Sequence, residues 1–72
     1  MGWIHVGGPL DGMDGNTDDL AAAIGLKAEW NDMDEWTITR REHGRVVVWV
    51  YVIGGDHMKL KGPVEIRNDY VE

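Results

Sequence analysis

Carboxylate or amide side chains occupy every second position from Asp14 to Asp18, at Asp14, Asn16 and Asp18. This is the arrangement that begins a calcium-binding loop. In such a loop the sixth position is a glycine that allows a sharp turn, and the twelfth is a glutamate that binds the ion with both oxygens. Here these two positions hold Asp19 and Gly25. The start of a helix explains the same residues without an ion, so we predict no bound metal and no cofactor.

Nucleophilic catalysis is excluded in its common forms, because the chain contains no serine and no cysteine. The histidines do not form a metal site, since His43 and His57 lie at opposite ends of one predicted strand, about 25 Å or more apart, and His5 has no second ligand nearby in the sequence. A carboxylate pair could perform acid–base chemistry, but a chain of 72 residues offers little cleft in which to shift pKa values. We therefore predict that the protein is not an enzyme.

The net charge of −6 is unevenly distributed along the chain. Residues 1–35 carry eight acidic and one basic side chain, a net of −7, whereas residues 36–72 carry five acidic and six basic side chains, a net of +1. Contacts to phosphates need lysine and arginine, so the acidic half predicts no direct binding of nucleic acid and favours a basic protein partner. The alternative interpretation is that the acidic surface only keeps a small protein soluble.

Trp30 is the aromatic residue that we expect at this acidic surface. Of the four tryptophans, Trp36 and Trp49 fit the core of a sheet, whereas Trp30 is flanked by acidic residues and is a candidate hot spot for a partner. The alternative is that Trp30 seals a helix against the sheet. The predicted partner-binding residues are Asp11, Asp14, Asp18, Asp19, Glu29, Trp30, Asp32, Asp34 and Glu35.

The strand that must organise these residues runs from Arg45 to Ile53. Eight of its nine residues are β-branched or aromatic, which favours a pleated strand over a helix. Because apolar side chains point to both faces, we expect a central strand that is covered on both sides.

Alternating residues from Glu35 to Glu42 predict a strand that pairs with the central one through a two-residue turn at His43–Gly44. One charged and two aromatic cross-strand pairs support this register: Glu42 with Arg45, Ile38 with Trp49, and Trp36 with Tyr51. A second turn is expected at Gly55–Asp56. Shorter strands are predicted at Trp3–Val6, at Met58–Lys61 and, as an edge strand, at Val64–Arg67.

A short helix is predicted between the first strand and the hairpin. Asn16 is a candidate N-cap, and two aspartates follow it in the first turn, where they complement the helix dipole. Gly25 is placed to end the helix, with Leu26 closing over its end. The helix could resume over residues 27–30. Its apolar face is expected to consist of Leu20, Ala23 and Ile24.

These elements predict one α+β domain over residues 1–72, with a small antiparallel sheet of three to five strands and one short helix packed on one face, in the order strand-helix-strand-strand-strand. The hairpin register defines an aromatic face with Trp36, Ile38, Val47, Trp49, Tyr51 and Ile53, and a valine face with Thr37, Thr39, Arg41, Val46, Val48, Val50 and Val52. We expect the helix on the valine face, because small branched residues leave room for it. The aromatic face would then need another cover, which could be the N-terminal strand, a curled sheet, a second subunit or a partner.

The segment Val6–Gly12 reads VGGPLDG, follows a short predicted strand and precedes a β-rich half with many aromatic residues. It resembles a pattern found in small uncharacterised proteins of tailed bacteriophages, and it covers about a tenth of the chain. The resemblance implies a phage or prophage origin and no particular activity. Small phage accessory proteins of this kind often bind a host protein, and some are minor virion parts.

We therefore expect a phage-type inhibitor that acts in host takeover by binding a basic surface of a host protein, for example a site that binds nucleic acid. The alternative is a structural or self-assembling virion component that uses its aromatic sheet face or an edge strand, and a homo-oligomer would fit this. The sequence shows no signal peptide, and its longest apolar run has eight residues, so we expect no membrane association. The expected location is the host cytoplasm or the virion.

Overall fold

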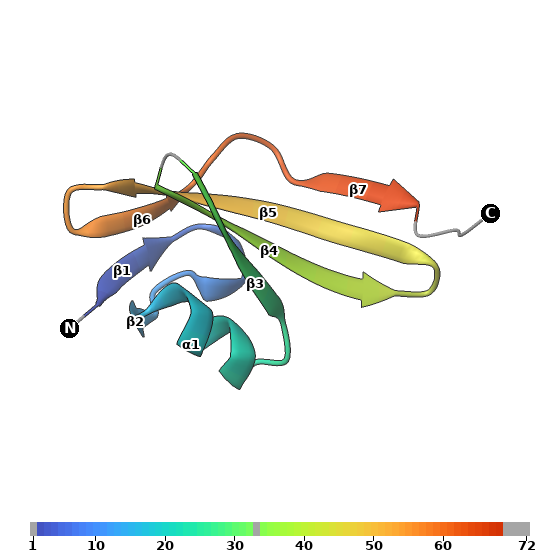
Figure 1. Ribbon diagram of the computed structural model, residues 1–72, viewed down its shortest axis with the longest axis horizontal. Coiled ribbons are helices and arrows are strands. Elements are labelled where there is room, and N and C mark those ends of the chain that lie inside the picture. Colours follow the sequence, from blue (N-terminus) through green and yellow to red (C-terminus); the bar gives the residue numbers. More distant parts are fainter. Residues whose placement is uncertain (1, 33, 69–72) are drawn as a thin grey trace.

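The computed structural model describes residues 2–32 and 34–68, which form one helix and a curled sheet (Figure 1). Seven strands and two short helical segments follow one another along the chain. In order, they are β1 (Trp3–Val6), the 3-10 helix η1 (Gly8–Leu10), β2 (Asp14–Gly15), α1 (Thr17–Ala23), β3 (Lys27–Asn31), β4 (Glu35–Glu42), β5 (Arg45–Gly54), β6 (His57–Leu60) and β7 (Glu65–Asn68).

The strands form one sheet in the order β2-β1-β6-β5-β4-β3, and β7 pairs with β5. β1 and β6 are parallel, and the other pairs are antiparallel. The central position predicted for residues 45–53 is confirmed, because β5 pairs with β4 along one edge and with both β6 and β7 along the other. The mixed α and β composition is also confirmed, but the expected three to five strands were too few.

The predicted hairpin register is confirmed at all three of its supporting pairs, Glu42 with Arg45, Ile38 with Trp49, and Trp36 with Tyr51. Both turn residues have positive φ angles, 52° at His43 and 75° at Gly44, as the tight turns that match the twist of a hairpin require. The second turn is confirmed as well, since Gly54 pairs with His57 across a tip at Gly55–Asp56. Local alternation and turn chemistry were sufficient to define both hairpins.

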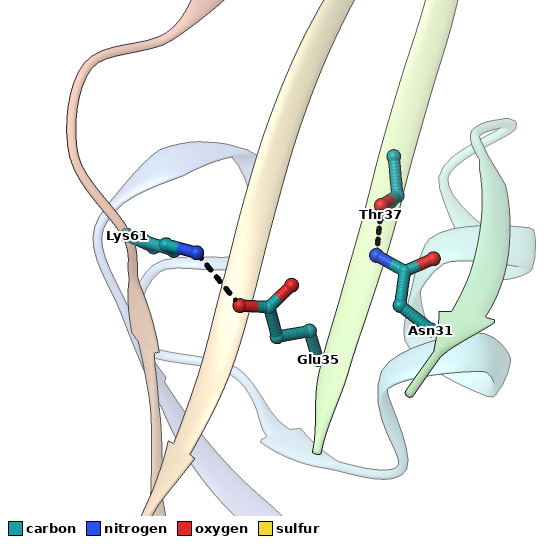
Figure 2. Close-up of polar contacts among 4 residues, drawn as sticks. All are labelled: Asn31, Glu35, Thr37 and Lys61. Atoms are coloured by element: carbon teal, nitrogen blue, oxygen red, sulfur yellow. Dashed lines mark hydrogen bonds and ion pairs between the residues drawn. The ribbon is translucent and has the colours of Figure 1, made fainter. Parts of the chain in front are cut away.

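Residues 27–31 form strand β3, so the expectation that the helix resumes there was wrong. β3 pairs with β4, and Trp30 lies opposite Trp36. On the other face of this pair, the Asn31 side-chain amide donates a hydrogen bond to the Thr37 hydroxyl (Figure 2). Lysine, alanine and glutamate favour helices, but the open edge of β4 and the burial of Ala28 against the core outweigh that preference.

The ends of α1 agree with the prediction. Asn16 takes the extended N-cap conformation, although its side chain makes no cap bond and its amide instead donates to the Asp19 carboxylate at 3.4 Å. At the other end Gly25 has φ = +79°, and the backbone N–H groups of Gly25 and Leu26 donate to the carbonyls of Ala22 and Ala21, at 3.1 and 2.8 Å. This is a Schellman motif, which satisfies the last carbonyls of the helix.

Replacing Gly25 with alanine should lower the free energy of unfolding by about 1–2 kcal/mol, because a Cβ atom disfavours the left-handed conformation. No atom lies within 4 Å of the added carbon, so a steric clash would not contribute. The matched control is Gly54→Ala, since Gly54 is equally uncrowded but its φ is not positive. Urea unfolding followed by tryptophan fluorescence should show little loss for the control, and an equal loss in both variants would contradict the C-cap assignment.

The helix packs on the aromatic face of the sheet, so the predicted valine face was wrong. The buried cluster consists of Leu10, Ala21, Ile38, Trp49, Tyr51 and Met58, and it combines α1, η1 and the aromatic face. The predicted inner face of the helix was right for Leu20, which packs against the core, but wrong for Ala23 and Ile24, which are exposed, while Thr17 and Ala21 are buried. These small buried residues bring the helix close to the sheet, and the large aromatic side chains fill the space between them and bury more apolar surface than valines could.

Within residues 2–32 and 34–68, no helix packs on the valine face. Val48 is buried and Val50 is half-buried, and both line a hollow of about 290 Å³ beside the Gly62–Pro63 segment. An ion pair between Lys61 and Glu35, with 2.8 Å between Nζ and Oε2, reaches across β5 on this side (Figure 2).

The molecule is elongated, with principal extents of 41 × 23 × 19 Å. Its far end consists of the β4–β5 hairpin and β7, which extend beyond the helix (Figure 1). We call residues 40–48 and 65–68 the distal arm. The arm carries four arginines and two glutamates: Arg40, Arg41, Arg45, Arg67, Glu42 and Glu65. Among the described residues, no helix has the length and hydropathy that a membrane span needs.

Candidate partner-binding surface

Four of the predicted acidic residues lie on the turn after η1, on β2 and in the first turn of α1, and all four are exposed. Asp11 accepts a hydrogen bond from the Gly7 backbone N–H at 2.7 Å and so helps to hold the turn between β1 and η1. The Asp18 carboxylate accepts from the backbone N–H of Asp19 at 2.9 Å, in the first turn of α1. Asp14 and Asp19 line an open hollow of about 520 Å³ between β2 and the helix.

The other predicted residues belong to β3, the β3–β4 connection and the start of β4. Asp32 and Asp34 are exposed, and Asp34 has φ = +59°, a conformation that aspartate tolerates at turns. Glu29 and Glu35 project from the valine side of the sheet, because they pair with Thr37 and Asn31 in the β3–β4 ladder. Glu35 is the least accessible of the group, since it is half-buried and paired with Lys61 (Figure 2).

Trp30 projects from the opposite side of the same strand. Its side chain is 49% exposed, and its ring lies edge-on to that of Trp36, with 5.3 Å between the centroids. Part of the ring therefore packs on the sheet while the rest remains accessible, so the expectation of an exposed tryptophan in this segment is confirmed. The nine predicted residues do not form one flat patch, because they come from the turn after η1, from β2, from the first turn of α1 and from β3 to the start of β4, and β2 and β3 are at opposite ends of the sheet.

No protein-family model, curated protein or solved structure matches this chain. Charge, exposure and strand geometry therefore carry the functional proposal. Over residues 2–32 and 34–68, no group of three or more histidine, cysteine, aspartate or glutamate side chains is arranged to hold a metal ion.

A buried polar network beneath the acidic loops was missed from the sequence. The His5 side chain is only 1% exposed, and its Nδ1–H donates to the Met13 carbonyl at 3.1 Å. Because a carbonyl can only accept, Nδ1 carries a proton, and Nε2 makes a hydrogen bond of 2.8 Å with the Thr17 hydroxyl. The His5 ring packs edge-on against Tyr51, with centroids 5.4 Å apart. Side chains alternate in direction along Trp3–Val6, so the sequence predicts that His5 points to the other face of the strand from Ile4 and Val6. Nothing in the sequence indicates which groups the His5 ring contacts.

Tyr51 connects this network to the glycine-rich turn. Its hydroxyl donates to the Gly7 carbonyl and accepts from the Leu10 backbone N–H at 3.0 Å. A Cβ atom at Gly8 would lie only 2.6 Å from this hydroxyl, which explains why a glycine stands there. Burial raises the pKa of Tyr51 above its ordinary value of 10.0. The network fixes the glycine-rich turn before Asp11 onto the central strand.

Proposed function

We propose that the protein is a non-enzymatic binding module that presents its acidic N-terminal half, with Trp30, to a basic surface of a host protein. The observation that carries this proposal is the exposure of charge: seven of the eight acidic residues in residues 2–35 are exposed, and one lysine accompanies them. Complementary charge would accelerate encounter and reject acidic partners, and a half-exposed tryptophan would supply apolar contact.

A host site that normally binds nucleic acid is a suitable target. Such a site is rich in lysine and arginine, and the carboxylates would stand where phosphates otherwise lie. Together with the resemblance to phage accessory proteins, this favours an inhibitor that acts during host takeover.

Neutralising Asp32 and Asp34 as asparagines should weaken capture of a basic partner by about tenfold at low salt, because two charges at the rim of the interface are lost. Asparagine also tolerates the left-handed conformation of Asp34, so the fold should be retained. The measurement is a quantitative pull-down from bacterial lysate at low and at high salt.

The matched control for this experiment is Glu42→Gln with Glu65→Gln, which changes the net charge equally but lies on the distal arm. This control variant should bind as the wild type does. If the wild type enriches no basic protein at low salt, the proposed binding activity is wrong.

Self-assembly, as in a structural virion component, is the second candidate function. The central residues of the aromatic face, Ile38, Trp49 and Tyr51, are buried in the core with α1 and η1, so they do not offer an interface. The observation in favour of self-assembly is instead that the described sheet ends in strands with an open edge, which are sites for pairing with another chain.

A further inference from the structure

Three strands of the described sheet, β2, β3 and β7, pair on one side only, and β3 and β7 are the longer of these edges. β3 pairs with β4 on one side only, and β7 pairs with β5 on one side only. An open edge presents backbone N–H and C=O groups that can bind another strand. Whether two edges can pair depends on which residues direct these groups outward.

Two backbone hydrogen bonds define the directions on the central strand. The Ile53 N–H donates to the Asp34 carbonyl at 3.1 Å, and the Lys61 N–H donates to the Val50 carbonyl at 2.7 Å. Backbone N–H and C=O groups alternate in direction along a strand. Those of odd-numbered β5 residues therefore point toward β4, and those of even-numbered residues point toward β6 and β7.

The same alternation extends to both edges. Glu65 and Arg67 lie opposite even-numbered residues of β5, so they bond to β5, and Ile66 directs its backbone groups outward. In β4 the backbone N–H and C=O groups of the odd-numbered residues point toward β3. Their partners in β3, Lys27, Glu29 and Asn31, therefore form hydrogen bonds to β4, while the backbone groups of Ala28 and Trp30 point outward. Trp30 and Ile66 are thus both free to form the hydrogen-bonded pairs of a new antiparallel ladder.

The side chains at these positions are complementary. Ile66 and Trp30 are the two most exposed large hydrophobic residues of the described chain, at 64% and 49%. Both lie on the aromatic side of the sheet, since Ile66 pairs with Val47 and Trp30 with Trp36. An antiparallel register that places Trp30 opposite Ile66 also places Glu29 opposite Arg67 on the other face.

We propose that β3 of one copy of this chain pairs antiparallel with β7 of a second copy, with Trp30 against Ile66 and Glu29 against Arg67. The hydrogen-bond phase, the faces of the sheet and the charges all agree with this register. The two edges also belong to regions of opposite charge, because β3 lies in the acidic half and β7 in the arginine-rich distal arm.

Local charge decides this contact more than the net charge of −6. The screening length is about 10 Å at 0.1 M salt, which is short compared with the 41 Å length of the molecule. The arm of one copy therefore responds mainly to the acidic surface nearest to it. The contact uses different surfaces on the two copies, so it would build rings or open chains and not a two-fold dimer.

This inference rests on the self-assembly candidate and names its partner. It also shares Glu29 and Trp30 with the proposed surface for a basic host protein, so the two interactions would compete. Arg67 lies outside that surface and separates the two in an experiment.

The test is a charge exchange, measured by sedimentation equilibrium over a range of concentrations at low salt. Wild type should show a mass average that rises with concentration. Glu29→Arg alone and Arg67→Glu alone should each weaken association by about tenfold, because like charges then face each other. An equimolar mixture of the two variants should associate as the wild type does, since every contact in an alternating chain pairs Arg with Glu, and the double variant should do so by itself.

A second pair of variants tests the backbone contact. Ile66→Pro and Ile66→Ala both remove the side chain, but only proline removes the outward N–H, and that loss costs no hydrogen bond within the chain. Proline should abolish association, and alanine should weaken it. A wild type that stays monomeric at all concentrations, or a mixture that fails to restore association, would overturn the proposal.

These results also separate this inference from the proposed function. Arg67→Glu should lose self-association and keep capture of a basic host protein, whereas Asp32→Asn with Asp34→Asn should do the reverse. If the mixture of variants fails to associate while the wild type still captures a basic host protein and the aspartate variant does not, only the proposed pairing of β3 with β7 is wrong.

Discussion

Replacing Ile38 with alanine should lower the free energy of unfolding by about 2–5 kcal/mol, the largest loss that we expect from one aliphatic truncation in this chain. Ile38 is fully buried and lies between Trp49 and Ala28 in the sheet, beneath α1. Three side-chain carbons would be lost, and the rigid neighbouring strands cannot close the cavity. A chain of 72 residues has a total stability of about 4–11 kcal/mol, so this loss would remove a large part of it.

The matched control is Ile66→Ala, which makes the same chemical change at a residue that is 64% exposed. It should cost less than about 1 kcal/mol, provided that unfolding is measured in dilute solution, where pairing between copies is absent. Urea unfolding curves of both variants give the comparison, and the midpoint should fall strongly for Ile38→Ala only. Equal midpoints would contradict the core described here.

The parts of the fold that the sequence predicts correctly depend on neighbours in the chain. The register of the β4–β5 hairpin follows from a two-residue turn and the pairing of side chains that lie close in sequence. The start of α1 after Asn16 and its end at Gly25 follow from residues within one helical turn. Local preference and final structure agree at these places, so reading the local pattern was sufficient.

The errors arise where distant contacts decide. Residues 27–31 have good helix formers, and pairing with β4 together with the packing of Ala28 against the core turns them into strand β3. In the same way, the alternation of side chains along the hairpin strands defines the two faces of the hairpin, but it does not indicate which face the helix covers. That choice depends on Ala21 packing in one cluster with Trp49 and Tyr51, which lie far away in the sequence.

The candidate surface shows the same division. Composition alone placed the acidic residues, and their exposure follows from their charge. The sequence could not show that Glu35 is held by Lys61, because that pair joins β4 to the segment after β6. Nor could it show that Glu29 and Trp30 point to opposite faces, since this requires knowing that they belong to a strand.

Replacing Tyr51 with phenylalanine should lower the free energy of unfolding by about 1–3 kcal/mol. The ring would still fill its place beside His5, so packing changes little. However, the buried Leu10 N–H would lose its acceptor and the Gly7 carbonyl would lose a donor. The control is Thr37→Val, which removes a half-buried hydroxyl whose partner, the Asn31 amide, can turn to water, and it should cost less than the Tyr51 variant.

The pH dependence of stability should identify the same hydroxyl. Burial raises the pKa of Tyr51 above 10.0, so on raising the pH the unfolded chain loses this proton before the folded chain does. The folded state then binds more protons than the unfolded state, and stability falls as the pH rises above about 10 towards the raised pKa. Urea unfolding of the wild type between pH 8 and pH 11 should show this loss, and Tyr51→Phe should show a shallower slope. A variant whose stability falls as steeply as that of the wild type would mean that the Tyr51 hydroxyl is not buried in the folded protein.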